Sequence, residues 1–337
     1  MNKRVLIVTH SGDLHADRIT ALLAAKGAPP LRINLDAFPR SYQLSQLIEN
    51  GRRVNRLRLL PQEQWIDLDT VGAVWMRKSG EFSYLSDDLA QQERAYARLE
   101  TEQALFSFLY TLDCYWMSHP RALRGALWKG EQLERARRMG FRVPASIVTN
   151  CPDEVRRFRQ RIAGPIIFKA MSTPTLAADD VEAAQRIAGT LTTTLVDDAM
   201  LADLDAVREL SCHFQEYIPK RHELRVTVVG RSVFAAALHS QDDARTMVDS
   251  RDMSAPIRYE ACTLAQDLNR RCVDFVRSYG LEYGALDLIV TPDGDIVFLE
   301  NNPAGQFLYV QELVPELRIL EALADTLHQE AQCPRQT

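Results

Sequence analysis

The stretch that most constrains the fold is residues 283–306, which reads YGALDLIVTPDGDIVFLENNPAGQ. Two apolar segments, residues 285–290 and 296–299, are rich in the Val, Ile, Leu and Phe that buried β-strands favour. Asp293 and Gly294 stand between them and are a strong signal of a two-residue hairpin turn. The sequence therefore predicts an antiparallel hairpin that carries acidic residues inside apolar strands.

A two-residue turn also predicts which residues face each other. If Pro292 faces Asp295, counting back along both strands places Asp287 opposite Glu300. Side chains alternate along a strand, so Asn302 shares the face of Glu300. Two carboxylates and an amide oxygen at one place are ligands that a hard cation such as Mg²⁺ prefers.

A simpler interpretation is that Asp287 and Glu300 are ordinary strand acids, each paired with a nearby Arg or Lys. The apolar flanks favour burial, however, and two unpaired buried carboxylates would repel each other. A bound cation would remove this conflict. The hairpin alone leaves both interpretations open.

Length, charge and cysteine spacing limit the class of protein. A chain of 337 residues can form two or three domains, and a net charge of −5 argues against general nucleic-acid binding. The six cysteines have neither CxxC nor zinc-finger spacing, which favours a reducing compartment. No signal peptide and no apolar run near the ~20 residues of a membrane span are visible. We expect a soluble, cytoplasmic protein that contacts no membrane.

The hydrophobic pattern divides the chain into three α/β regions, which we expect at residues 1–118, 119–212 and 213–330. In the first we expect strands at 5–9, 31–35 and 71–76 and helices at 15–26 and 87–112. In the second we expect a helix over 120–140, strands at 147–149 and 166–169, and a helix at 153–162. In the third we expect strands at 224–229 and 233–238, a helix at 263–279, and the hairpin.

Three further features precede the hairpin along the chain. Lys129 lies in the run KGEQL, Lys169 ends the apolar strand GPIIFK, and residues 214–218 read FQEYI before the segment HELRVTVVG. Each has an ordinary explanation: a lysine on a helix or at a strand end is usually solvated, and FQEYI could be an edge strand.

In this order the features resemble an ATP-grasp ligase over nearly the whole chain. The resemblance implies an α/β (α+β) ATP-grasp fold, with an N-terminal α/β domain and two α+β lobes that clamp ATP. It implies that Lys129 and Lys169 contact the nucleotide phosphates and that Asp287, Glu300 and Asn302 hold Mg²⁺, with two ions expected. The implied adenine and ribose contacts are Gln215, Glu216, Tyr217, Ile218 and Glu223.

The motifs WMRK, KGEQL, FRVPASIVTN, HELRVTVVG and FLENNPAGQF further resemble the microviridin-type branch of this family. Those enzymes are graspetide synthetases, which close ω-ester or ω-amide rings in ribosomally made peptides and release ADP and phosphate. Two positions depart from the pattern. An aliphatic residue is expected where Asn301 stands, and an aromatic residue is expected where Ser250 stands.

Arginines complete the expected site. Arg225 is the candidate for holding the attacking carboxylate and the transferred phosphoryl group, because a guanidinium fork suits both; alternatively it is an ordinary strand arginine paired with Glu223. Arg251 is a second candidate carboxylate clamp, and Arg77 a candidate substrate contact. Glu223 could instead orient Arg225.

The resemblance also implies a partner, a precursor peptide whose leader segment docks on the enzyme. Residues 177–206 could hold part of that surface, and a homodimer is expected by resemblance alone. Two other functions remain open. One is an ATP-grasp ligase that adds an amino acid to a peptide or protein, as the glutamate ligases do; the other is a non-catalytic ATP- or peptide-binding module.

Overall fold

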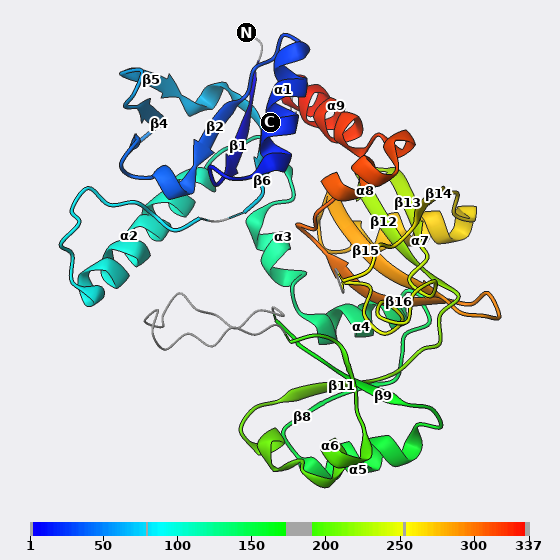
Figure 1. The fold of residues 1–337 in the computed structure, drawn as a ribbon. Coiled ribbons are helices and arrows are strands. Elements are labelled where there is room, and N and C mark those ends of the chain that lie inside the picture. Colours follow the sequence, from blue (N-terminus) through cyan, green and yellow to red (C-terminus); the bar gives the residue numbers. More distant parts are fainter. Residues whose placement is uncertain (1–2, 79, 173–190, 252–253, 334–337) are drawn as a thin grey trace.

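The computed structural model describes residues 3–78, 80–172, 191–251 and 254–333 (Figure 1). Its strands form four sheets: a parallel and a small antiparallel sheet near the N-terminus, a central antiparallel sheet, and a five-stranded C-terminal sheet. Figure 1 shows the central sheet at the bottom, with the C-terminal sheet above it to the right and the N-terminal sheets to the left. The predicted α/β (α+β) class is confirmed.

The N-terminal parallel sheet has the strand order β2-β1-β6-β7. Its strands are β1 (Arg4–Thr9), β2 (Leu31–Asn34), β6 (Val71–Met76) and β7 (Tyr115–Met117), and its helices are α1 (Leu14–Ala25) and α2 (Gln91–Leu109). The last helix, α9 (Ile319–Gln332), returns to this domain and packs against α1 and β6 (Figure 1). Gly72 permits this contact, because a Cβ at that position would lie 2.1 Å from the carbonyl oxygen of Ala331.

The chain segment that connects β2 to β6 forms a separate three-stranded antiparallel sheet, which was not expected from the sequence. Its strands are β3 (Tyr42–Glu49), β4 (Arg52–Leu59) and β5 (Gln64–Asp67). Along β4, Asn55 and Leu57 are buried while Arg56 is exposed, so the face alternates as an open sheet requires. Frequent arginines conceal this alternation in the sequence.

The central lobe is a four-stranded antiparallel sheet in the order β10-β9-β11-β8. The strands are β8 (Ser146–Thr149), β9 (Ile166–Lys169), β10 (Thr194–Leu195) and β11 (Cys212–Glu216); the helices are α5 (Pro152–Arg161) and α6 (Asp198–Ala202). Phe158 of α5 packs with Ile166 and Phe214 on one face of the sheet. The alternate residues Lys169 and Gln215 therefore face the other way, toward the C-terminal lobe.

The C-terminal lobe is a five-stranded antiparallel sheet in the order β14-β13-β12-β15-β16. Its strands are β12 (His222–Val229), β13 (Ser232–Leu238), β14 (Tyr259–Cys262), β15 (Tyr283–Val290) and β16 (Ile296–Asn302). The helices that accompany it are α3 (Pro120–Gly125), α4 (Lys129–Arg138), α7 (Gln266–Arg277) and α8 (Leu308–Leu313). Leu133 of α4 and Phe275 of α7 join Leu288 and Phe298 in one core on one face of the sheet.

The prediction of a single helix over residues 120–140 is wrong. The chain forms α3 and α4 with a break between them, and Lys129 is the first residue of α4. At the break Ala126 is fully buried, and its carbonyl accepts a hydrogen bond from Gln132 Nε2 at 2.7 Å. This inward turn places the N-terminus of α4, with Lys129, against β16.

The turn of the β15–β16 hairpin also differs from the prediction. Thr291 donates its backbone N–H to the carbonyl of Asp295, so the loop has three residues, and Gly294 adopts φ 92°. Pairing beyond the turn is therefore shifted by one residue, until a bulge at Leu299 shifts it back. Asp287 thus does lie opposite Glu300, as predicted, but only because two irregularities compensate each other.

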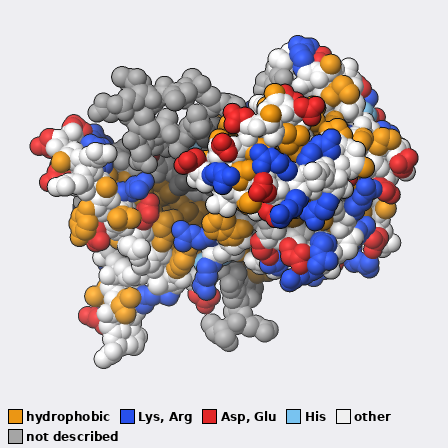
Figure 2. Space-filling view, turned by 90° about the horizontal axis from the view of Figure 1, so that it is seen from below, with side chains coloured by type: hydrophobic (Ala, Val, Ile, Leu, Met, Phe, Trp, Pro, Cys, Tyr) orange, Lys and Arg blue, Asp and Glu red, His pale blue; other side chains and the backbone are white. Residues whose placement is uncertain are grey.

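On the face seen from the side of the central lobe, acidic and basic side chains are intermingled (Figure 2). Many of the exposed charges pair with a residue of the same helix. Arg156 pairs with Asp153 within α5, and Arg137 pairs with Glu134 within α4, both at 2.8 Å. Among the described residues, each helix is too short or too polar to cross a membrane.

Candidate active site

The central and C-terminal lobes enclose a cavity of about 1080 Å³. Its walls come from β9, β11, the linker that follows β11, the pocket-facing residues of β12, β15 and β16, and the loop between β13 and β14. Of the thirteen residues expected from the sequence to bind ATP, Mg²⁺ or substrate, all but Arg77 line this cavity. The residues that line it are Lys129, Lys169, Gln215, Glu216, Tyr217, Ile218, Glu223, Arg225, Arg251, Asp287, Glu300 and Asn302.

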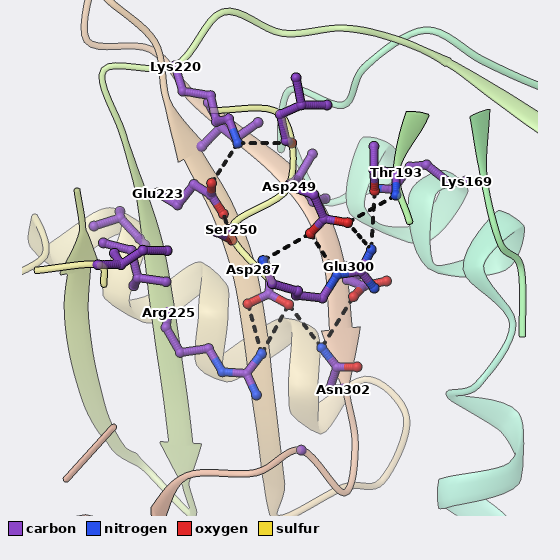
Figure 3. A pocket seen from close by; sticks show the side chains of 18 of the residues that line it. Lys169, Thr193, Lys220, Glu223, Arg225, Asp249, Ser250, Asp287, Glu300 and Asn302 are labelled. Carbon is purple, nitrogen blue, oxygen red and sulfur yellow. Dashed lines mark hydrogen bonds and ion pairs between the residues drawn. The ribbon is translucent and has the colours of Figure 1, made fainter. Parts of the chain in front are cut away.

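The polar end of the cavity is formed by side chains of β12, β15 and β16 (Figure 3). Arg225 Nη1 donates to both carboxylate oxygens of Asp287, at 2.8 and 3.0 Å. Asn302 Nδ2 lies 3.0 Å from Asp287 Oδ2 and 3.5 Å from Glu300 Oε1. Rotating the terminal amide of Asn302 by half a turn would point its oxygen at the same place, which is the orientation that a cation needs.

The bulge at Leu299 explains why this face carries both apolar and acidic groups. Because Leu299 is left out of the pairing, it and Glu300 both face the cavity. Leu299 packs with Ile218, Ile289 and the fully buried Val297. Ile218, Ile289 and Leu299 line the cavity and form an apolar surface next to the carboxylates. An apolar floor beside a charged end suits a ligand with a flat base and a charged tail.

The premise that Asp287 and Glu300 are unpaired is corrected by the structure. Asp287 pairs with Arg225, and Glu300 Oε2 lies 3.3 Å from Lys129 Nζ. Burial raises the pKa of Asp287, and the nearby Glu300 adds to this effect against the opposing charge of Arg225. Burial also acts on Glu300, but Lys129 and Lys169 overcome it and hold the pKa of Glu300 below its usual value.

The set contains two carboxylates and an amide, and the described residues include no group of three or more His, Cys, Asp and Glu side chains that could hold a metal ion. A hard cation with phosphate oxygens completing its coordination does not require such a cluster. The carboxylates of Asp287 and Glu300 and the amide of Asn302, with basic side chains beside them, therefore fit a Mg²⁺ ion that is bound together with a polyphosphate.

The two lysines approach the same place from different lobes. Lys129 Nζ donates to the carbonyl of Ala170 at 2.8 Å, which ties α4 to the end of β9. Lys169 Nζ lies 3.4 Å from Gln215 Oε1, and Gln215 Nε2 donates to Ser146 Oγ at 3.0 Å. Burial lowers the pKa of Lys169. A phosphate in the cavity would restore the charge balance that favours the protonated lysine.

The linker after β11 borders the apolar part of the cavity. Glu216, the last residue of β11, donates its backbone N–H to the carbonyl of Ala145 at 2.8 Å, and Tyr217 donates to the carbonyl of Pro165 at 3.0 Å. The Tyr217 hydroxyl donates to the carbonyl of Met247 at 3.4 Å. The linker is thus held between the central lobe and the β13–β14 loop.

Glu223 does not orient Arg225, and the alternative in which the two residues pair is wrong. The carboxylate of Glu223 accepts hydrogen bonds from Lys220 at 2.6 Å and from Ser240 and Ser250 at 2.8 Å. Ser250, one of the two departures from the family pattern, therefore contacts a residue of the predicted nucleotide site.

Arg251 is held by Asp249, with Nε at 2.8 Å from Oδ1 and Nη2 at 2.6 Å from Oδ2. Asp249 Oδ2 also accepts from the backbone N–H of Thr193, which belongs to the central lobe, at 3.0 Å (Figure 3). Although burial opposes it, hydrogen bonds from Arg251 and Thr193 keep the pKa of Asp249 well below its usual range. Asp249 and Arg251 thus connect the two lobes at the cavity.

Arg77 is not placed as a substrate contact. Its side chain is buried, lies 3.4 Å from Asp13 Oδ2, and donates to the carbonyl of Ala304 at 2.8 Å. Arg77 therefore binds the backbone of the loop after β16 and does not line the cavity, whereas its neighbour Lys78 does. Residues 177–190, which belong to the segment 177–206 considered for leader binding, lie outside the described residues.

Sequence reasoning missed three residues near the cavity: Lys220, Asp249 and His213. Lys220 and Asp249 line it. His213 is buried on β11 opposite Lys169, and neither of its ring nitrogens has a hydrogen-bond partner in the described part of the chain. Burial, together with the nearby Lys169 and Lys129, lowers the pKa of His213 to about 4. The only sequence signal was the position of His213 next to FQEYI.

Two lobes that close on a cavity with paired lysines and a carboxylate–carboxylate–amide set define an ATP-grasp protein. A family model described as the MvdD pre-ATP grasp domain matches residues 4–124. No curated protein matches the chain.

Solved structures are similar over nearly the whole length. The RiPP-associated ATP-grasp ligase of Chryseobacterium gregarium, in complex with ADP and a leader and core peptide, is 29% identical with a TM-score of 0.87, covering 99% of this chain and 98% of that one. The macrocyclase MdnC of Microcystis aeruginosa MRC, bound with precursor peptide MdnA, is 27% identical with a TM-score of 0.83, covering 97% and 99%. The macrocyclase MdnB of the same organism is 30% identical with a TM-score of 0.77, covering 96% and 99%.

The chain therefore belongs to the ATP-grasp ligases that modify ribosomally made peptides, in the microviridin-type macrocyclase branch.

Proposed function

We propose that this protein uses ATP to close macrocycles in a ribosomally made precursor peptide, joining an Asp or Glu side chain to a Ser or Thr hydroxyl or a Lys amine. The observation that carries the proposal is the joint placement of Lys129, Lys169, Asp287, Glu300 and Asn302 at one end of a single cavity. The similarity to MdnB and MdnC, two macrocyclases, supports peptide ring closure as the reaction.

In this proposal the nucleotide lies along the cavity. The base rests on the apolar surface of Ile218, Ile289 and Leu299, and the linker residues border it. Glu223 binds the ribose. The phosphates extend toward Lys129 and Lys169, whose point charges neutralise them.

Asp287, Glu300 and Asn302 would hold Mg²⁺, which supplies a positive charge to the phosphate oxygens when bound. Arg225, between Asp287 and the loop after β16, would orient the substrate carboxylate and the transferred phosphoryl group, because its guanidinium can donate to both. Arg251 would support the substrate carboxylate from the β13–β14 loop.

The chemistry has two steps. A carboxylate oxygen of the peptide attacks the γ-phosphorus, the bond from that phosphorus to the β–γ bridging oxygen breaks, and ADP leaves. A hydroxyl or amine of the same peptide then attacks the acyl carbon of the acyl phosphate, phosphate leaves, and the proton of the nucleophile passes to solvent or phosphate. The contribution of the protein is positioning and charge stabilisation in a cavity closed by two lobes.

The test is ADP formation by the purified protein with MgATP, with and without a candidate precursor that carries its leader, while the peptide mass is followed. We expect peptide-dependent ADP formation and the loss of one water mass for each ring. Glu300→Gln should abolish both, whereas Glu260→Gln, which changes an exposed acid of the same sheet, should not. A mass gain of one amino-acid residue would instead identify a glutamate-ligase type of reaction, and nucleotide binding without turnover on any peptide would favour a binding module.

A further inference from the structure

The free edge of the C-terminal sheet lies directly behind the proposed cation site. β16 is the last strand of that sheet, so its outer side has no full strand beside it. An isolated bridge to Arg142 pairs this edge at Val297, where the backbone N–H of Phe298 donates to the carbonyl of Arg142 at 2.8 Å, but this bridge does not reach Asn301. At Asn301 this edge is buried, with 1% of the residue exposed. A buried peptide N–H and C=O without partners would be strongly unfavourable.

The side chain of Gln132, on α4, supplies both missing partners. The backbone N–H of Asn301 donates to Gln132 Oε1 at 2.7 Å, and Gln132 Nε2 donates to the carbonyl of Asn301 at 2.9 Å. The same Nε2 donates to the carbonyl of Ala126 at 2.7 Å. A primary amide can accept and donate at once, so Gln132 pairs with β16 as a further strand would. Gln132 itself is 2% exposed.

The two neighbours of Asn301 are the residues that face the cavity. Glu300 and Asn302 point to the cavity face, opposite to the side chain of Asn301, since side chains alternate along the strand. Fixing the peptide groups of Asn301 therefore fixes the backbone from which both oxygen-bearing side chains extend.

Gln132 also lies one turn after Lys129 on the same helix, and residues three apart share a helix face. Lys129 Nζ lies 3.3 Å from Glu300 Oε2. The Gln132 amide thus connects the helix that carries the phosphate-facing lysine to the strand that carries two cation ligands. The hydrogen bond from Gln132 to Ala126 also fixes the turn between α3 and α4, directly before Lys129, the first residue of α4.

We propose that Gln132 is a positioning residue, which sets the distance between Lys129 and the cation ligands Glu300 and Asn302 by pairing with the edge of β16. The inference rests on the proposed function, because it concerns the affinity of that same site for a divalent cation and nucleotide. Gln132 itself does not touch the ligand.

The matched variants are Gln132→Met, which keeps length and removes the hydrogen bonds, and Gln311→Met. Gln311 makes a comparable bridge on α8, donating to Glu321 at 3.0 Å and accepting from the Leu320 N–H at 2.7 Å. Both variants lose a glutamine bridge between a helix and another segment, but only Gln132 bonds the strand that carries the proposed cation ligands. Gln132→Glu, which keeps an acceptor for the Asn301 N–H but loses the donor to the carbonyls of Ala126 and Asn301, serves if the methionine variant does not fold.

The readout is direct binding of Mn²⁺ in the presence of ADP, measured by titration with the full chain below its melting temperature, together with ADP binding in EDTA. Removing a group that orients metal ligands weakens metal affinity about 10- to 100-fold. We expect Gln132→Met to weaken Mn²⁺ binding by about tenfold or more and to change ADP binding in EDTA by less than about twofold. Gln311→Met should bind both like the wild type.

Equal loss of Mn²⁺ affinity in Gln132→Met and Gln311→Met, or unchanged affinity in both Gln132 variants, would overturn the positioning role while leaving the proposed function intact. A wild-type protein that binds neither ADP nor Mn²⁺ would overturn the proposed function and the inference with it. The wild-type titration therefore separates the two failures.

Discussion

Arg225 and Asp287 form an ion pair across neighbouring strands, with a single guanidinium nitrogen 2.8 and 3.0 Å from the two carboxylate oxygens. A second guanidinium nitrogen, Nη2, donates to the carbonyl of Gln306 at 3.0 Å. Asp287 raises the pKa of Arg225 although burial acts in the opposite direction, so the charge is permanent. A fixed positive charge thus lies between the proposed cation ligands and the loop after β16, which also lines the cavity.

Arg225→Lys keeps the charge but loses the planar fork, so we expect it to lower kcat for peptide-dependent ADP formation by about 100-fold or more. The matched control is Arg258→Met, which removes an exposed arginine that pairs with Glu260 at 2.8 Å. Exposed pairs contribute only about 0.2–1 kcal/mol, so this control should change neither rate nor stability noticeably. Steady-state kinetics decide between the two outcomes, and equal rates in wild type and Arg225→Lys would remove Arg225 from the proposed mechanism.

Lys129→Met and Lys169→Met should each raise the KM for ATP, because each removes a positive charge from the proposed phosphate site. A lost charge-assisted hydrogen bond corresponds to about 1.5–3 kcal/mol, or roughly 10- to 100-fold in affinity. The control is Lys26→Met. Lys26 pairs with Asp325 of α9 at the surface of the N-terminal domain, and neither residue lines the cavity. The measurement is ATP-dependent ADP formation at fixed Mg²⁺ and peptide. An unchanged KM in both lysine variants would contradict the placement of the phosphates.

Adjacent asparagines on β16 should respond in opposite ways to the same substitution. Both polar atoms of the Asn301 side chain are buried without hydrogen-bond partners in the described part of the chain. Asn301→Leu has a similar shape and removes this unfavourable pair, so it should raise the free energy of unfolding by about 1–3 kcal/mol and preserve turnover. Asn302→Leu should abolish turnover, because it removes a proposed cation ligand. Denaturant titrations and ADP assays on both variants test the pair, and a destabilised Asn301→Leu would show that the polar side chain has a partner in solution.

His213→Leu should stabilise the protein, and the gain should depend on pH. The pKa of His213 falls from 6.5 when unfolded to about 4 in the folded chain. The unfolded chain therefore takes up the proton first, and the wild type loses stability as the pH falls from 6.5 through about 4. The slope is at most about 1.4 kcal/mol per pH unit, and His213→Leu lacks this contribution. Urea titrations at several pH values should show a stability difference that grows with acidity; a difference independent of pH would place the ring in a polar environment.

The local sequence determined a large part of this protein. Apolar runs of four to eight residues predicted β6 and β15 closely, because burial on both faces leaves few other possibilities. Residue types and their order also brought twelve predicted site residues to one cavity. The family pattern contributed here, since no spacing rule alone would associate Lys129 with Glu300.

Tertiary structure decided what depends on contacts between distant segments. The sequence could not show that Asp287 pairs with Arg225, that Arg77 turns inward to Ala304, or that His213 is buried beside Lys169. The predicted helix over 120–140 was broken because Ala126 must turn inward for α4 to reach β16, and helix propensity does not record that demand.

The β15–β16 hairpin shows most clearly which features the local sequence determined and which the tertiary structure decided. The sequence determined that Asp287 and Glu300 lie on facing strands, since apolar flanks and an Asp-Gly turn require it. Tertiary packing decided the register, with a three-residue loop at one end and a bulge at Leu299 at the other. The reason is that backbone pairing tolerates a one-residue shift, whereas the core on one face and the charged cavity on the other do not.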